Sequence, residues 1–475
     1  MKTKTKAFLL LINEFQHINT KCYQLSSNLF NKLSNNLLMF RRFFYIFYIF
    51  ISETIKFHYN NWICILIFNI PLSPRLELVK SITNRLENLN IVYVKVFQSL
   101  CLEKNILYEN EKDYLLKYTD NVPYKTEELD YELLNLLESK YNIRLEDSQP
   151  INSGIVGLVF KGLDGNDNDS KVVIKLLKKN IENRLNSVFD ELEYLTFIMS
   201  YIPYLNSINL HKFFLDNKEL LIDQIDFIKE VVNIEIFKFK NQNLPEYRIP
   251  YVYKEITNDY KNVIVMENIK GLTIGDIETF DSDIKEEFGK LLIRFGFTSI
   301  FYNSAIHCDL HAGNIFFYIN DDTSFMPKYQ LGLIDFGICS FPDKNNQNYY
   351  YIFFNDFFYK KDFSDREKLD NIIHCCIHEK EYYNNFSQEK KENLFSKIIE
   401  SIKFYSIEKE VDIEFLININ MIFKKFNLKF SKEFNNIFLS LASSNNLARL
   451  LCNSITKTQF ECLEKISQVN KLLEF

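Results

Sequence analysis

Two carboxylates and one amide of the chain are spaced as phosphoryl-transfer chemistry requires. Residues 307–314 read His-Cys-Asp-Leu-His-Ala-Gly-Asn, and an Asp-Phe-Gly sequence at 335–337 begins 21 residues after Asn314. At this spacing the Asp309 carboxylate can lie beside a transferable hydroxyl group, while oxygens of Asn314 and Asp335 can ligate Mg²⁺. The pattern predicts Mg²⁺-dependent phosphate chemistry, with Asp309 as a catalytic residue and Asn314 and Asp335 as metal ligands. The alternative is that some of these polar side chains only cap turns.

A glycine-containing segment lies upstream of these motifs. Backbone N–H groups of such a hairpin can cover phosphates, and a lysine on the following strand can pair with them, here Lys175 in Val-Val-Ile-Lys. Taken alone, an ordinary Gly-containing β-hairpin is an equally good interpretation. The loop residues predicted to bind a nucleotide are Ile151, Asn152, Ser153, Gly154, Ile155, Val156, Gly157, Leu158 and Val159.

The lysine needs an acidic partner, and a segment that is helical by its period offers two. Asp226 and Glu230 are four residues apart and therefore share one face of a helix expected over 225–240. We expect Glu230 to pair with Lys175, which makes both of them catalytic residues beside Asp309. The alternative is that both acids are solvated on the surface. The order of glycine loop, lysine, acidic helix, Asp/Asn motif and Asp-Phe-Gly is that of protein-kinase-like folds.

Glycine usage and hydrophobic periodicity indicate the elements that must position these residues. All eleven glycines lie between Gly154 and Gly337, so tight turns and ligand loops are expected there. Apolar residues at i, i+3, i+4 and i+7 predict helices in both flanks. The middle of the chain divides into a β-rich part and a mostly helical part after Asn268. We therefore predict an α+β, bilobal fold with a small β-rich lobe and a helical lobe. Strands are expected at 156–161, 171–176, 262–267, 314–318 and 329–335, and helices at 128–140 and 395–404.

These residues resemble the UbiB-like atypical kinases associated with ubiquinone biosynthesis, between positions 80 and 345. The 307–314 segment is similar to the family's His-x-Asp-x-His-Pro-Gly-Asn loop, whose second histidine separates it from ordinary protein kinases. Residues 249–255 and 265–267 look like the family's approach to the hinge between lobes, which adds Glu267 to the nucleotide-binding residues. No Ala-Pro-Glu motif follows Asp-Phe-Gly, which also suits this family. Segments 95–98 and 120–123 occupy the places of two further family signatures.

The resemblance implies a protein-kinase-like fold with an added N-terminal helical element, and it implies Mg-ATP binding. The residues in the usual roles would be Lys175, Glu230, Asp309, Asn314 and Asp335. We expect a basic, aromatic-rich helical region at 1–78 and a family-type helical extension at 79–145. A kinase-like N-lobe would follow at 146–268 and a kinase-like helical C-lobe at 269–475.

The chain departs from the family pattern in three respects. Phe97 replaces the glycine of the Lys-x-Gly-Gln signature, and Gln224 replaces an acid expected before Asp226. The family's alanine-rich nucleotide loop is here a glycine loop, as in ordinary kinases. These departures concern access of the substrate, and they leave the phosphate and metal residues in place.

Composition narrows the class of protein and its compartment. The 475 residues carry a net charge of −6, which disfavours a nucleic-acid binder with a wholly basic surface. Nine cysteines without a Cys-x-x-Cys pair disfavour a disulfide scaffold and favour a reducing, intracellular environment. No apolar run reaches the 18 residues of a membrane span. Residues 1–50 hold seven Lys/Arg against Glu14 alone, so cytoplasmic, peripheral-membrane and mitochondrial locations all stay open.

Four other features have alternative interpretations. The apolar runs 43–51 and 62–70, the first preceded by Arg41 and Arg42, fit either an anionic membrane surface or a buried helix pair. His374 and His378 are four apart on an expected helix and could bind a transition metal, but no third ligand is apparent nearby. Cys308 is either a reactive thiol or, as we expect, a small buried residue. The aromatic run 349–359 fits a lipid-facing groove less well than a packed helix.

The sequence therefore predicts an ATP-binding, Mg²⁺-dependent phosphotransferase or ATPase of the UbiB-like kind, whose partners are a nucleotide, an unknown acceptor and a membrane surface or lipid. One alternative is a Ser/Thr protein kinase, favoured by the glycine loop and disfavoured by the missing Ala-Pro-Glu motif. Another is a catalytically silent ATP-binding scaffold, which the joint presence of Lys175, Asp309, Asn314 and Asp335 disfavours.

Overall fold

The structure, a computed structural model, divides the chain into two compact units. The first unit comprises 1–130, 152–158 and 178–221, and the second comprises 131–151, 159–177 and 222–475. The structure describes residues 41–61 except 43, 75–94, 108–116, 122–199, 222–322, 326–405, 413–453 and 455–473, with 97, 215, 218 and 324 as single positions. The apolar run 62–70 and all of 95–98 except Phe97 lie outside these residues, as do positions 120 and 121.

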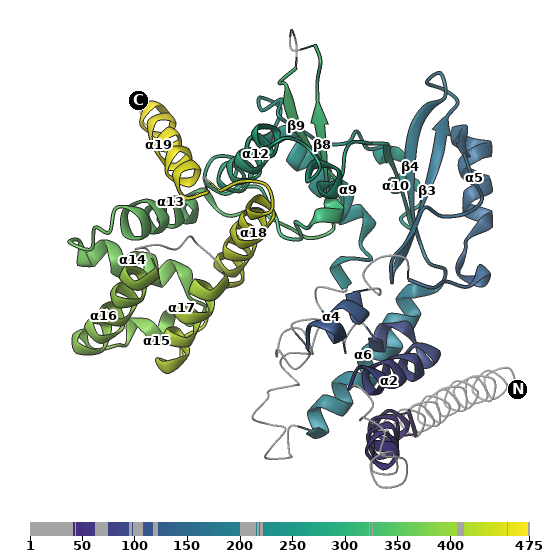
Figure 1. Ribbon diagram of the computed structural model, residues 1–475, viewed down its shortest axis with the longest axis horizontal. Coiled ribbons are helices and arrows are strands. Elements are labelled where there is room, and N and C mark those ends of the chain that lie inside the picture. Colours follow the sequence, from purple (N-terminus) through teal and green to yellow (C-terminus); the bar gives the residue numbers. More distant parts are fainter. Residues whose placement is uncertain are drawn as a thin grey trace, which may run out of the picture. The chain divides into compact units, whose positions relative to one another are not determined.

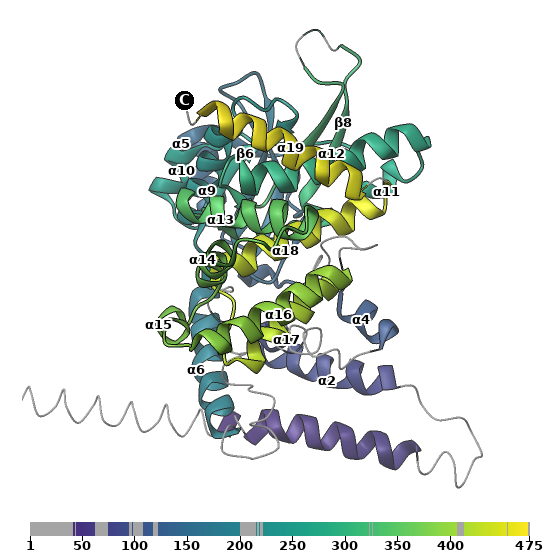
Figure 2. The ribbon, with the colours of Figure 1, turned by 90° about the vertical axis from the view of Figure 1, so that its left-hand side faces the viewer.

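The described part of the first unit is mainly helical. Its elements are a helix over 41–61, α2 (Arg75–Leu89), α4 (Glu109–Leu116), η2 (Thr126–Glu128), the short strand β2 (Asn152–Ser153) and α6 (Ile181–Met199). The 41–61 helix and α2 lie side by side (Figure 2), and an ion pair of 2.7 Å joins Arg85 to Glu53 between them. α2 buries a stripe with the i, i+3, i+4, i+7 spacing of an amphipathic helix, formed by Val79, Ile82, Thr83 and Leu86.

The second unit contains the β-rich lobe predicted from the sequence. Its sheet has the strand order β1-β3-β4-β6, and α5 (Tyr131–Tyr141) lies beside it (Figure 1). The strands expected at 156–161, 171–176 and 262–267 are confirmed. Their β-branched residues pack well on the pleated, partly buried surface of a sheet. The strands are β1 (Ile143–Leu145), β3 (Gly157–Asp164), β4 (Ser170–Leu177) and β6 (Val263–Glu267).

The second unit also contains a three-stranded sheet of order β5-β9-β8. Strands β8 (Ile315–Ile319) and β9 (Tyr329–Leu333), both expected from the sequence, pair as an antiparallel hairpin, and β5 (Tyr247–Arg248) pairs with β9 in parallel. A two-stranded sheet joins β7 (Ile306–His307) to β10 (Cys339–Ser340). These short strands hold the motifs at 307–314 and 335–337 next to each other.

Helices make up the rest of the second unit. In Figure 2, α12 runs beside both α18 and α19, and a Cβ atom at Gly289 of α12 would lie 2.5 Å from Cys452 Cβ. Glycine therefore permits this close approach. The helices are α9 (Phe227–Lys240), α10 (Lys254–Asp259), α11 (Ile274–Ile277), α12 (Ser282–Phe301), η3 (Ala312–Asn314), α13 (Lys344–Ile352), the π-helical η4 (Phe353–Tyr359), α14 (Arg366–Cys376), α15 (Lys380–Asn384), α16 (Gln388–Tyr405), α17 (Ile413–Lys425), α18 (Lys432–Arg449) and α19 (Ile455–Leu473). The α+β architecture, with a β-rich part and a helical part, is thereby confirmed.

One expectation from the sequence is wrong. His374 and His378 do not share a helix, because α14 ends at Cys376 and Ile377 is extended. Ile377 forms a β-bridge with Phe430, a contact across 53 residues that the local period could not indicate. The described residues contain no cluster of three or more His, Cys, Asp or Glu side chains suited to a metal.

Two further expectations concern apolar segments. The aromatic run 349–359 forms α13 and η4 and packs inward, with Tyr350 and Phe354 at most 1% exposed. This confirms the packed helix rather than a groove. Within the described residues, no helix has the length and apolar character needed to cross a bilayer.

Candidate functional site

An ion pair between β4 and α9 lies at the centre of the candidate site. The Lys175 Nζ is 2.8 Å from both carboxylate oxygens of Glu230, and the two side chains are 15% and 1% exposed. Alternation along β4 explains the position of Lys175, because Val172, Ile174 and Leu176 are buried on the opposite face of the strand. The pair expected from the sequence is present.

The structure also distinguishes the two acids that the sequence offered. Asp226 is the N-cap of α9, and its side chain accepts a hydrogen bond of 3.0 Å from the Lys229 N–H. It satisfies a free amide of the first turn, as capping aspartates do. Glu230 lies one turn further along, on the buried face of the helix with Phe227 and Ile234. The two acids therefore have different tasks.

Asp335 completes a group of three charged side chains. Its Oδ2 lies 3.3 Å from Lys175 Nζ, and its backbone has a positive φ of 61°. A non-glycine residue with such a φ is uncommon and is often found at functional sites. The Asp335 Oδ1 accepts a hydrogen bond of 3.3 Å from the Gly337 N–H. The side chain is 43% exposed, so one side of the carboxylate is open to a ligand.

The neighbouring Phe336 fixes the orientation of Asp335. Its ring is buried against Phe237 of α9 at 5.0 Å and against His307 at 5.3 Å between ring centroids. Asn233 Nδ2 donates a hydrogen bond of 2.8 Å to the Phe336 carbonyl. With its ring and carbonyl both held by α9, the Asp-Phe-Gly segment presents Asp335 to Lys175.

The three charges shift one another's ionisation. Burial disfavours the charged form of Lys175, but the carboxylates of Asp335 and Glu230 outweigh burial and raise the pKa of the lysine. Burial likewise opposes ionisation of Asp335, but Lys175 and the Gly337 amide lower the pKa of this carboxyl group overall. Burial raises the pKa of Glu230, while Lys175 acts in the opposite direction. Lys175 is therefore a cation at neutral pH, with an ionised Asp335 beside it.

Hydrogen bonds hold the 307–314 loop at the end of the β8–β9 hairpin that is next to Asp335. Asn314 is buried, its Nδ2 donates a hydrogen bond of 2.9 Å to the Asp309 carbonyl, and its own carbonyl accepts one of 3.0 Å from the Ile334 N–H. Because Ile334 immediately precedes Asp335, both predicted metal ligands lie at one end of the hairpin. His311 caps η3 by accepting a hydrogen bond from the Gly313 N–H.

The donor set fits Mg²⁺. The Asn314 Nδ2 donates to the Asp309 carbonyl, which leaves the side-chain oxygen Oδ1 of Asn314 as the atom that can ligate a cation. The Asp335 carboxylate is ionised and partly open. Two protein oxygens are what Mg²⁺ takes when substrate phosphates and waters complete its shell. Asn314 and Asp335 would hold the ion.

Glu267 is placed at the end of β6, but its carboxylate already has partners. It forms an ion pair with Arg248 and accepts a hydrogen bond of 3.2 Å from the Tyr251 N–H, and these contacts lower its pKa against the effect of burial. Its backbone N–H donates to the Tyr251 carbonyl at 2.8 Å. Its backbone carbonyl accepts a hydrogen bond of 3.0 Å from the Ile269 N–H, so the side chain and both backbone groups of Glu267 have partners within the protein.

The glycine loop is divided between the two units. Residues 152–158 belong to the first unit, whereas Ile151 and Val159 belong to the second and pair through an N–H to carbonyl bond of 2.7 Å. Within the first unit, Gly154 N–H donates to the Gly157 carbonyl at 2.9 Å, which closes the turn. Every other predicted site residue lies in the second unit.

Sequence reasoning did not identify Asn233 and Arg248. A signal existed for Asn233, which is three residues after Glu230 and therefore on the same helical face. None existed for Arg248, because its contact with Glu267 crosses two elements. Cys308, expected to be a small buried residue, is only partly buried, but burial raises the pKa of its thiol to about 12 and disfavours the reactive thiolate.

The part of the chain that carries these motifs matches a family of known proteins. The model of the ABC1 atypical kinase-like domain matches residues 127–369, a range that includes Lys175, Glu230, Asp309, Asn314 and Asp335. The match covers just over half of the chain.

Curated relatives named "Probable protein kinase UbiB" match between 38% and 59% of the chain. The protein from Glaesserella parasuis serovar 5 (strain SH0165) is 28% identical over 299 residues, which are 59% of this chain and 51% of the relative. The protein from Actinobacillus pleuropneumoniae serotype 5b (strain L20) is 30% identical over 186 residues, which are 38% of this chain and 32% of the relative. The chain thus spans at most about half the length of these relatives.

A solved structure, that of the Rv3197–erythromycin complex from Mycobacterium tuberculosis, aligns with 75% of this chain and 91% of its own. The TM-score is 0.40 and the sequence identity is 15%.

Proposed function

The chain belongs to the ABC1 atypical kinase-like, or UbiB-like, family, and from this premise we propose that it binds ATP with Mg²⁺ and transfers or hydrolyses the terminal phosphate. The observation that carries the proposal is the position of Lys175 Nζ, 2.8 Å from both Glu230 oxygens and 3.3 Å from Asp335. A cation between a buried structural acid and a partly open acid is the arrangement that phosphoryl transfer uses.

Each residue has a separate task in this proposal. Glu230 orients Lys175, whose ammonium group neutralises phosphate oxygens of the nucleotide. Asn314 and Asp335 hold Mg²⁺, which would supply charge neutralisation on the polyphosphate. Asp309 orients the acceptor hydroxyl or water, or accepts its proton. The negative charge that develops during transfer is stabilised mainly by the metal and Lys175, which are already in place, so positioning and electrostatics supply most of the rate.

Turnover and binding of ATP, measured together, test this proposal. We expect the full chain to bind Mg-ATP and to release or transfer phosphate. Asp309→Asn should keep its affinity within about threefold and lose about 10²-fold or more of its turnover, as removal of a positioned base does. Asp321→Asn, the same change at an exposed position in the β8–β9 turn, serves as the control. Absence of ATP binding by the wild type, or unchanged turnover in Asp309→Asn, would contradict the proposal.

A Ser/Thr protein kinase is the second candidate, favoured by the glycine loop closed between Gly154 and Gly157. Radiolabelled ATP offered with mixed proteins and with lipid extracts separates the two functions. Label in protein supports the protein kinase, and label in a small molecule or lipid, or release of phosphate alone, supports the first candidate.

The 41–61 helix supports a further part of the proposal, contact with a membrane surface. Tyr48, Ile51, Ile55 and Tyr59 recur at helical spacing and are 42% to 63% exposed. Arg41 and Arg42 are the first described residues of this helix, and basic side chains of this kind accompany the apolar face of interfacial helices. Sedimentation with anionic and neutral liposomes tests it, with Ile55→Ser and Tyr59→Ser expected to reduce binding. Binding by both variants that equals binding by the wild type would contradict membrane contact through this helix.

A further inference from the structure

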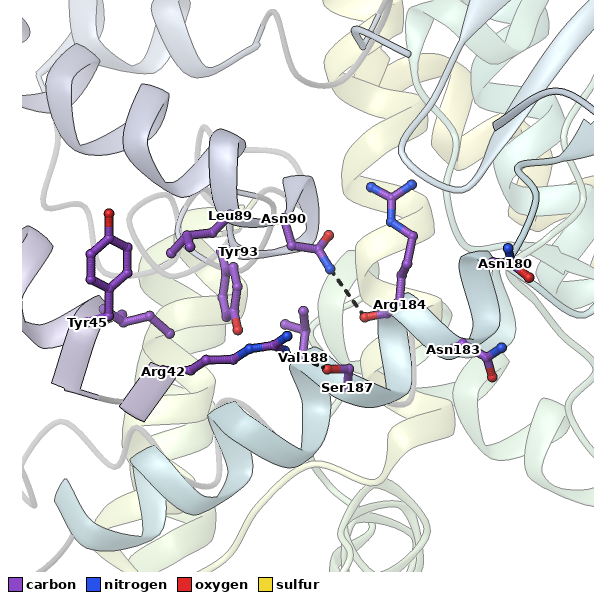
Figure 3. A pocket seen from close by; sticks show the side chains of 11 residues that line it. Arg42, Tyr45, Leu89, Asn90, Tyr93, Asn180, Asn183, Arg184, Ser187 and Val188 are labelled. Carbon is purple, nitrogen blue, oxygen red and sulfur yellow. Dashed lines mark hydrogen bonds between the residues drawn. The ribbon is translucent and has the colours of Figure 1, made fainter. Parts of the chain in front are cut away.

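The first unit contains a cavity that is separate from the Lys175 site. Its volume is about 320 Å³, within the range of small-molecule sites, which begins near 300 Å³. Three helical segments form it: the 41–61 helix, the end of α2 with the residues after it, and the first half of α6 (Figure 3). The described lining residues are Arg42, Tyr45, Ile46, Leu89, Asn90, Tyr93, Asn180, Asn183, Arg184, Ser187 and Val188.

The charge of the lining is one-sided. Arg42 and Arg184 are cations, and no acidic side chain is among the described residues that line the cavity. Two carboxylates that do not line the cavity pair with these arginines: Glu191 with Arg42 and Glu128 with Arg184. These acids are 4% and 13% exposed, so they neutralise the arginines without facing the cavity.

Both guanidinium groups retain donors for a ligand. Arg42 uses Nη1 for Glu191 and for Ser187 Oγ, the latter at 3.1 Å, and Arg184 uses Nη1 for Glu128. A guanidinium carries five N–H donors, so the Nε and Nη2 donors of each remain available. Figure 3 shows Arg42 reaching from its own helix toward Ser187 on α6. The side chains of Arg42 and Arg184 are 47% and 30% exposed, which leaves them accessible from the cavity.

The remaining wall is mixed: Asn90, Asn180, Asn183 and Ser187 are polar, and Tyr45, Ile46, Leu89 and Val188 form an apolar part. Ile46 and Val188 are buried at its base, whereas Tyr45 and Leu89 are 44% and 41% exposed. Large apolar side chains that are half exposed at the rim of a cavity gain free energy when a ligand covers them. Asn90, which donates a hydrogen bond of 3.4 Å to the Arg184 carbonyl, connects the apolar side of the cavity to the cationic side.

We propose that this cavity binds a small amphipathic anion, which is a carboxylate or phosphate group attached to a compact apolar body. The anionic group contacts Arg42 and Arg184, and the apolar body covers Tyr45 and Leu89. The proposal does not depend on nucleotide binding, because every lining residue lies in the first unit and none belongs to the Lys175 site.

Calorimetric titration of the full chain with octanoate and 4-phenylbutyrate tests the proposal, with octanamide as the neutral probe. We expect saturable binding of at least one of the acids and at least about tenfold weaker binding of the amide, since a charge-assisted hydrogen bond contributes about that factor. Equal binding of acid and amide, or no saturable binding of either acid, would overturn the proposal.

Variants localise the site. Arg42→Gln should weaken binding of the acids at least about fivefold, while Arg42→Lys restores part of it. Arg144→Gln is the matched control, because Arg144 is 45% exposed, also pairs with an acid and lies in the second unit. Leu89→Trp fills the cavity at a partly exposed position and should also weaken binding if it folds as the wild type does. Undiminished binding in both Arg42→Gln and Leu89→Trp would overturn the proposal.

Discussion

Asn233 donates a hydrogen bond of 2.8 Å to the backbone carbonyl of Phe336, and this bond joins α9 to the residue that follows Asp335. Both groups are buried, and the same helix carries Glu230 one turn earlier. One helix face therefore fixes the acid that pairs with Lys175 and the segment that presents Asp335. The geometry of the site depends on α9 as a unit.

The first prediction concerns this hydrogen bond. Asn233→Ala leaves the Phe336 carbonyl buried without its partner, so the free energy of unfolding should fall by about 1–3 kcal/mol. Denaturation in urea measures the loss. Asn385→Ala removes the same kind of hydrogen bond, from a side-chain amide to a carbonyl at 3.0 Å, on the surface, and should cost less than about 0.5 kcal/mol. Equal effects of the two substitutions would contradict the role of Asn233.

The second prediction concerns the buried ion pair. Lys175→Met leaves Glu230 buried and unpaired, so stability should fall by about 3 kcal/mol. Glu230→Gln in the Lys175→Met background should recover part of this loss, because it removes the uncompensated charge. A double-mutant cycle from urea denaturation measures the coupling. Additive effects of the two substitutions would show that the two side chains do not interact.

The third prediction concerns pH. Burial lowers the pKa of His307 in the folded chain, although the Ile334 carbonyl opposes the shift. The unfolded chain therefore binds more protons below about pH 6.5, the ordinary value for histidine, and stability should decline as the pH falls below it. His307→Phe keeps an aromatic ring against Phe336 and should flatten this decline, as followed by melting temperature between pH 7.5 and about 5.

A control accompanies the pH measurement. His378→Phe replaces a histidine whose side chain is 77% exposed. We expect the decline of stability at low pH to persist in this variant. A decline that is equally steep in His307→Phe would mean that other groups cause it.

The fourth prediction tests helix packing in the second unit. Gly289→Ala places a Cβ 2.5 Å from both Cβ and Sγ of Cys452, and overpacking of this kind costs about 1–3 kcal/mol. Gly275→Ala meets nothing closer than Thr273 Oγ1 at 3.8 Å, so it should be neutral or stabilising. Thermal unfolding of both variants gives the comparison. A stabilising Gly289→Ala would contradict the close approach of α12 to Cys452.

Local patterns account for the parts of the fold that the sequence predicted. The β-branched runs around Lys175 and Val265 became β4 and β6, and the i, i+4 relation of Asp226 and Glu230 placed both on α9. The order of motifs along the chain then indicated that Lys175 and Glu230 would meet. The first two inferences use a period or a spacing within a few residues, and the third uses the order of motifs typical of protein-kinase-like folds.

Contacts between distant segments account for what the sequence could not predict. α14 ends before His378 because Ile377 pairs with Phe430. The side chain of Glu267 forms an ion pair with Arg248. The cavity in the first unit is lined by three helical segments that are distant in the sequence. No window of the sequence contains these partners together. The positive φ of Asp335 is likewise a feature that no period or spacing of the sequence indicates.

The most direct test of the central claim, that Lys175, Glu230 and Asp335 form one Mg-nucleotide site, is the dependence of ATP affinity on Mg²⁺ in the wild type and in Asp335→Asn. Calorimetric titration with ATP is done in Mg²⁺ and in EDTA, with Asp321→Asn as the control. We expect Mg²⁺ to strengthen ATP binding at least about tenfold in the wild type and the control, and to have almost no effect in Asp335→Asn, because the ion loses a charged ligand. An equal effect of Mg²⁺ in all three proteins would contradict the account.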